Sequence, residues 1–168
     1  WRKRGRNPSD TIKLFRSFCS SFWYYSVMLT LPPTNRTVVG TMYRLRELIQ
    51  EEAPHIEQVV PYFAGASLED VWRWLFRVTR YQDDPPMIER IRVPEAQYAA
   101  LRRGEKMVGD CDDMVALAGA LLIRLGWTVE IVAQAYDRDQ TLDHVFLRVH
   151  QNGATTAFDL ANLTESRG

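Results

Sequence analysis

A chain of 168 residues is long enough for one domain with a real hydrophobic core, because a chain of about 150 residues buries about two thirds of its unfolded surface. Basic and acidic residues both number 21, so no net charge attracts nucleic acid or an anionic membrane. Two cysteines, Cys19 and Cys111, do not form a disulfide framework, which favours a reducing compartment. We expect one globular domain without nucleic acid as a partner.

Residues 1–33 are predicted to be an N-terminal arm, and residues 34–168 one domain. The arm begins with the basic sequence WRKRGRNPSD and continues with the apolar, aromatic SFCSSFWYYSVMLTL. This order imitates a signal peptide, but the apolar part contains serines, lacks an A-x-A-like exit and is shorter than the roughly 20 residues of a spanning helix. We expect no signal peptide and no membrane span. The arm either packs on its own domain or docks on another subunit.

The first predicted helix covers TMYRLRELIQEEA, residues 41–53, where apolar residues recur at helical spacing before Pro54. Residues 54–65 contain two prolines and end in glycine, which predicts a connection with a short helical turn. A second helix is predicted over 68–81, because Ser67 and the aspartate three positions later form a capping-box start. The tryptophans and phenylalanine of this helix thicken its apolar stripe and are expected to belong mainly to the core.

The segment QDDPPMIERIRVPE, residues 82–95, has prolines near both ends and predicts an extended loop that runs toward Cys111. EAQYAALRRG, residues 95–104, predicts a short helix that ends at its glycine. Residues 110–125 are almost entirely apolar after their first turn, so this helix must be buried on most sides. Gly126 provides its C-terminal stop.

Three strands are predicted after this helix, over residues 127–136, 143–150 and 155–162, with a charged turn over 137–143. Helices followed by consecutive strands define an α+β class. We therefore expect N-terminal helices and a buried helix that carries the cysteine at its N-terminus and packs on an antiparallel sheet.

The sequence GDCDDMVALAGALLIRLG, residues 109–126, places Cys111 in the first turn of the buried helix. The helix dipole and the free backbone N–H groups of a first turn favour a thiolate. The neighbouring Asp110, Asp112 and Asp113 have the opposite effect, because their charges raise the pKa of a thiol. A reactive Cys111 therefore needs a cationic partner, and histidine is the usual one.

His144 begins the second predicted strand, and Asp159 lies on the next strand. If this end of the sheet meets the helix N-terminus, His144 approaches Cys111 and Asp159 orients its ring. His150 lies further along the strand and His55 lies in the proline-rich connection, so we interpret both as surface residues. An isolated histidine is more often structural, and spacing alone therefore leaves the triad as one alternative.

Three blocks, GDCDDMVALAGALLIRLG, DHVFLRV and FDLA, resemble the transglutaminase-like branch of the papain-like cysteine enzymes, in the compact form found in bacterial and phage proteins. The resemblance is strongest over residues 68–162. It implies Cys111 as nucleophile, His144 as general base and acid, and Asp159 as the orienting carboxylate. The activity implied is acyl transfer or hydrolysis on a protein or peptide amide, as in a protease, an amidase or a transglutaminase.

Family members often have a tryptophan and a proline around the third block, whereas Phe158 precedes Asp159 here and LANLTESRG follows. The backbone N–H of the nucleophile is expected to be one oxyanion donor. Gln82, Tyr81 and Trp72 are the candidates for substrate contact and for the second donor.

A metal centre is not expected from the spacing. A calcium loop that began at Asp110 would need glycine and glutamate where Val115 and Leu121 stand, and zinc spacings such as CxxC or HExxH are absent from the sequence. We predict neither a metal nor a cofactor, and a cytoplasmic or virion-associated location. The alternative function is a non-catalytic assembly module, for instance in a phage particle, whose aromatic arm binds a neighbouring protein.

Overall fold

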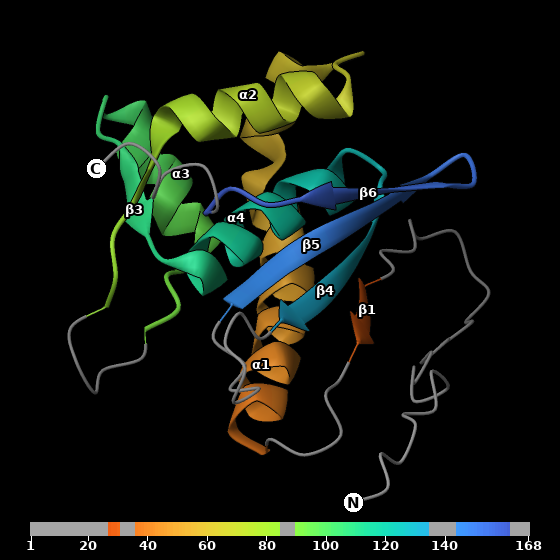
Figure 1. Cartoon of the computed structure of the whole chain (residues 1–168). Coiled ribbons are helices and arrows are strands. Elements are labelled where there is room, and N and C mark those ends of the chain that lie inside the picture. The colour runs from red at the N-terminus through yellow and green to blue at the C-terminus, as the bar shows by residue number, and fades with distance from the viewer. Residues whose placement is uncertain (1–26, 31–35, 85–89, 135–143, 162–168) are drawn as a thin grey trace, which may run out of the picture.

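The computed structural model describes residues 27–30, 36–84, 90–134 and 144–161. Helix α4 (Cys111–Arg124) packs against helix α1 (Arg36–Glu52) and against the strands β4 (Thr128–Gln134) and β5 (His144–Gln151) (Figure 1). The predicted α+β class, with a buried helix on an antiparallel sheet, is confirmed.

The main sheet has the strand order β1-β4-β5-β6. β4, β5 and β6 (Ala154–Phe158) form the predicted antiparallel meander, while β1 (Val27–Thr30) joins the edge in parallel with β4. Residues 27–30 of the predicted arm thus pair with the domain. Residues 1–26 and 31–33 of the predicted arm and the predicted turn over 137–143 lie outside the described residues.

Helix α4 forms the centre of the core, and each of its residues from 112 to 123 is buried. It approaches α1 closely because Gly119 has no side chain, and a Cβ there would lie 2.6 Å from Cδ1 of Ile49. Leu125 ends the helix, and Gly126 follows with a φ of 92°, a conformation that glycine adopts without strain. The predicted burial and the predicted stop are both confirmed.

The first predicted helix is confirmed as α1, which ends one residue before a 3-10 helical segment, η1 (Ala53–Phe63). We expected only a short helical turn in the connection over residues 54–65. This prediction was wrong, because the helical segment runs from Ala53 to Phe63. Four residues of η1 are buried in the core: Ala53, Ile56, Val59 and Phe63. The apolar spacing of this segment therefore outweighed its two prolines, one of which, Pro54, stands where a helix tolerates proline.

Helix α2 (Leu68–Val78) begins with the predicted capping box, in which Ser67 and Asp70 exchange side-chain and backbone hydrogen bonds. The prediction that this helix continues to residue 81 was wrong. Residues 79–81 instead form β2 (Thr79–Tyr81), which pairs in parallel with β3 (Met107–Gly109). Strands of three residues are too short for a recognisable alternation, so the sequence showed neither of them.

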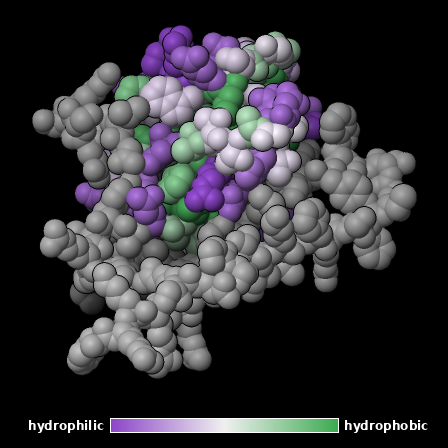
Figure 2. All heavy atoms as spheres, turned by 45° about the vertical axis from the view of Figure 1, so that its right-hand side comes forward, coloured by the Kyte–Doolittle hydropathy of each residue, from purple (hydrophilic) through white to green (hydrophobic). Residues whose placement is uncertain are grey.

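Helix α3 (Pro94–Arg102) confirms the predicted short helix, and Gly104 follows it with a φ of 79°. Among the described residues, no helix is long and apolar enough to cross a membrane. Figure 2 shows hydrophilic residues interleaved with narrow hydrophobic strips on the described part of one face. The large hydrophobic residues that are exposed, Tyr43, Tyr62 and Val93, belong to three different segments.

Candidate active site

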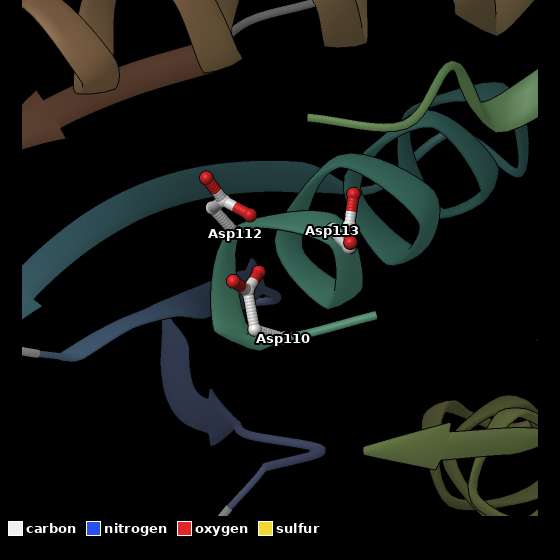
Figure 3. Close-up of side chains that lie close together, drawn as sticks. All are labelled: Asp110, Asp112 and Asp113. Atoms are coloured by element: carbon white, nitrogen blue, oxygen red, sulfur yellow. The ribbon is translucent and has the colours of Figure 1, made fainter. Parts of the chain in front are cut away.

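Cys111 is the first residue of α4 and follows directly after β3 and Asp110. The entry to the helix is tight, because a Cβ at Gly109 would collide with the Asp113 side chain. Only glycine leaves room for Asp113 to fold back against the end of β3. Figure 3 shows the three aspartates gathered around this first turn.

The Cys111 thiol is half-buried, and its surroundings favour the protonated form. Burial raises the pKa of Cys111 to about 12, the charges of Asp110 and Asp112 act in the same direction, and backbone N–H groups of Val145 and Asp112 oppose them only in part. The desolvation penalty and two carboxylates thus outweigh the favourable helix N-terminus. Cys111 is therefore a neutral thiol at rest near pH 7.

His144 is the first residue of β5 and is 8% exposed. Its Nε2 atom lies 2.8 Å from Oδ2 of Asp159, which follows the last residue of β6. The imidazole ring also stacks on Phe146, with 6.0 Å between the ring centroids. Asp159 is held as well, because its Oδ1 accepts the backbone N–H of Ala161 at 3.0 Å. The pair is therefore fixed from both sides.

The start of β5 lies beside the thiol. The backbone N–H of Val145, the residue after His144, lowers the pKa of the Cys111 thiol, so the two residues are neighbours. Cys111, Val145 and Asp159 also line one small pocket of about 10 Å³, which has room for about one water molecule. Helix α4, strand β5 and the end of β6 thus converge on one place.

The structure places Tyr81 near Cys111. The Tyr81 phenol is half-buried, and burial, followed by the charges of Cys111 and Asp83, raises its pKa above the ordinary value of a phenol. Gln82 is exposed and lies beside the end of β3, where its backbone N–H donates to the Gly109 carbonyl at 2.9 Å. The pairing of β2 with β3 brings both residues to the entrance of α4.

Trp72 lies on the other side of the site, in α2. Its indole Nε1–H donates to the backbone carbonyl of Asp159 at 3.1 Å. An indole carries one N–H, and here that N–H points to Asp159. This geometry differs from the expected donation to an oxyanion and connects Trp72 with the orienting carboxylate.

The sequence did not reveal an ion pair between the buried Asp113 and Arg92. The Asp113 side chain is fully buried and accepts both the backbone N–H of Arg92, at 2.5 Å, and the guanidinium of the same residue. Arg92 also lies 3.7 Å from Asp84, whose side chain is 7% exposed. The predicted loop toward Cys111 thus contacts the first turn of α4 through Arg92. The only sequence signal for this was the acidic start of the loop.

Carboxylate oxygens of Asp110, Asp112 and Asp113 lie within 4.8 Å of one another, a grouping that has the right atoms for a cation. Arg92 already supplies a positive charge to Asp113, so we do not propose a metal site at these three aspartates. His55 is exposed, and His150 bonds to Thr155 at 2.9 Å and lies 3.3 Å from Glu130, so neither belongs to this site.

No family model and no curated protein matches this chain. Among solved structures, the crystal structure of a provisionally assigned cysteine protease from Cytophaga hutchinsonii is similar, with a TM-score of 0.40 and 16% identical residues. The match covers 80% of this chain and 46% of the other, so this chain spans less than half the length of that neighbour. A likeness at this level carries no argument about activity. The transglutaminase-like resemblance stays a prediction.

Proposed function

We propose that the protein is a cysteine-dependent enzyme that acts on amide bonds by acyl transfer or hydrolysis. The supporting observation is that His144 and Asp159 are hydrogen-bonded at 2.8 Å, and that Asp159 and Val145, the residue after His144, line one pocket with Cys111. A nucleophile, a base and a residue that orients the base are the three parts of such a site. The resemblance of the three sequence blocks supports the same reading.

In the proposed reaction, the thiol is protonated in the resting state, because the pKa of Cys111 is raised to about 12. Nε2 of His144 is engaged by Asp159, so Nδ1 is the nitrogen that takes the thiol proton. Sγ of Cys111 forms a bond to the amide carbonyl carbon as the proton leaves. His144 acts here as a general base, and a preformed ion pair is not required.

The carbonyl oxygen then carries negative charge, which the backbone N–H of Cys111 at the helix N-terminus stabilises. Tyr81 or Gln82 is proposed as the second donor, since both lie at the entrance of α4. His144 gives its proton to the nitrogen of the breaking C–N bond, and the amine departs. Water, or a second amine, then loses a proton to His144 and forms a bond to the acyl carbon. The C–S bond breaks, and His144 returns the proton to the Cys111 sulfur.

The size of the pocket limits the kind of substrate. The pocket that the described residues form beside Cys111 has about 10 Å³, which is room for about one water molecule and too little for a substrate side chain. We therefore propose that the substrate is a protein or peptide amide that lies across the surface at Cys111. Hydrolysis and transfer to an amine use the same acyl-enzyme and differ only in the acceptor.

The proposal is tested with p-nitrophenyl acetate as an acylating probe in a Cys19→Ser background. Mass spectrometry measures the rate at which Cys111 becomes acetylated, and iodoacetamide labelling is followed against pH in parallel. We expect His144→Ala to slow acetylation by about 10²-fold or more, as loss of a general base does. Equal rates in the parent and in His144→Ala would overturn the catalytic reading.

The second candidate is the non-catalytic assembly module, and one observation favours it. A thiol whose pKa is raised to about 12 by burial and by two carboxylates is a poor nucleophile unless a base acts on it. Under this reading Cys111 labels slowly, with or without His144, and the protein keeps its fold for binding. The labelling experiment therefore separates the two functions directly.

A further inference from the structure

The backbone directly after β6 is held by a side chain from a distant part of the sequence. Phe158 is the last residue of β6 that pairs with β5, and Asp159 is the next residue along the chain. Its backbone carbonyl is held by the Trp72 indole, which stands 87 positions earlier. A residue that follows the end of a strand has lost the ladder that fixes backbone direction. For Asp159, the hydrogen bond from the Trp72 indole N–H restrains the backbone in place of the strand ladder.

Trp72 is itself restrained by its surroundings, so it can restrain the backbone of Asp159. Helix α2 is anchored by its capping box and by the fully buried Val71 and Leu75. The Trp72 ring stacks on Phe76 in the same helix, with 5.0 Å between the centroids and 9° between the planes. An indole restrained in this way donates its hydrogen bond in one direction, at little further cost in side-chain entropy.

We propose that Trp72 is a positioning residue, which sets the direction of the Asp159 carboxylate toward His144 by holding the Asp159 backbone. The inference rests on the proposed function. The chain of contacts runs from the indole N–H to the Asp159 carbonyl at 3.1 Å, and from the Asp159 carboxylate to His144 at 2.8 Å. Without the first contact the backbone of Asp159 gains freedom, and the second contact weakens.

The test compares two equivalent substitutions in one helix. Trp72→Phe keeps an aromatic ring to stack on Phe76 and removes the indole N–H. Trp74→Phe makes the same chemical change two residues later, where the ring contacts Phe63 and Tyr98 rather than the site. Any general cost of replacing tryptophan in α2 is therefore present in both variants.

The first readout is the NMR signal of the His144 Nε2 proton and its exchange with solvent, which a purely structural role of Trp72 would not move. We expect exchange to quicken in Trp72→Phe and to stay unchanged in Trp74→Phe. The second readout is Cys111 acetylation, which we expect to slow by about two- to tenfold in Trp72→Phe, the effect of one hydrogen bond. An unchanged His144 signal in Trp72→Phe would overturn the inference.

A third measurement covers the case in which Trp72→Phe does not fold. In the parent protein, the Trp72 indole N–H should exchange with solvent more slowly than an exposed indole, and rapid exchange would contradict the inference. Failure of the proposed function has a different signature. In that case His144→Ala leaves Cys111 acetylation unchanged, while the His144 signal still responds to Trp72→Phe.

Discussion

Two pairs, each of a basic residue and a largely buried aspartate, lie near Cys111, and they differ in kind. The His144–Asp159 pair joins the start of β5 to the end of β6, whereas the Arg92–Asp113 pair joins the loop before α3 to the first turn of α4. Asp113 is fully buried and Arg92 is one third exposed, while His144 and Asp159 are each largely buried. Both pairs satisfy a buried carboxylate.

The difference lies in what each basic residue does with its proton. A guanidinium stays charged at every physiological pH, so Arg92 neutralises Asp113 and secures the loop without taking part in proton transfer. An imidazole gains and loses a proton near neutral pH, so His144 is suited to general acid–base chemistry. We propose that the Arg92–Asp113 pair maintains the structure around Cys111 and that the His144–Asp159 pair provides its reactivity.

The largest effects are expected from two single substitutions that are compared with each other, His144→Ala and Arg92→Ala. The first should slow Cys111 acetylation by about 10²- to 10⁴-fold and lower the free energy of unfolding by about 1–3 kcal/mol, because Asp159 loses its imidazole partner. The second should lower the free energy of unfolding by about 3 kcal/mol, because it leaves Asp113 buried without its cation. Acetylation rates and urea unfolding measure the two effects. Similar losses of rate and stability in both variants would remove the distinction between the pairs.

Gly109→Ala attacks the structural pair without touching a charge. The new Cβ would collide with Asp113, so the side chain must leave its place beside Arg92. We expect a loss of about 2–3 kcal/mol of unfolding free energy, in the range of an overpacked core. Gly40→Ala in α1 is the control, because nothing lies within 4 Å of its Cβ position and alanine favours a helix. If urea unfolding shows that Gly109→Ala is as stable as the parent protein, the close approach of Asp113 to Gly109 is contradicted.

Alkaline pH tests the environment of the thiol. The pKa of Cys111 is raised from 9.0 to about 12 in the folded protein, so the unfolded chain loses this proton first. Above about pH 9 the unfolded state binds fewer protons than the folded state, and stability must fall as the pH rises toward 12. The loss should reach about 2 kcal/mol near pH 10.5. Unfolding curves of Cys111→Ala should lack this part of the decline, while the tyrosines still contribute theirs.

The smallest effect is expected from Asp110→Asn. This substitution removes one of the charges that raise the pKa of Cys111 and keeps the side chain nearly the same size. One unit of pKa corresponds to about a tenfold change in thiolate at a given pH, so iodoacetamide should label Cys111 up to about tenfold faster. Slower or unchanged labelling would show that Asp110 does not act on the thiol.

Much of the fold was predictable because its signals are local. The apolar run of 110–125, the glycine after it and the alternating strands each follow from a short stretch of sequence, and α4, β4, β5 and β6 confirm them. The error at residues 79–81 has the opposite origin. β2 exists because it pairs with β3, a partner about 28 positions away, and three residues carry no periodicity of their own.

The candidate site divides in the same way. The sequence by itself determined that Cys111 begins a buried helix and that His144 begins a strand, since these positions depend on local patterns. It placed Asp159 on the next strand, whereas Asp159 follows the last residue of β6. Only the tertiary structure decided that Arg92 neutralises Asp113, that Trp72 holds the Asp159 carbonyl and that the thiol is protonated at rest. The physical reason is that ion pairing, long-range hydrogen bonding and desolvation depend on which groups meet in space.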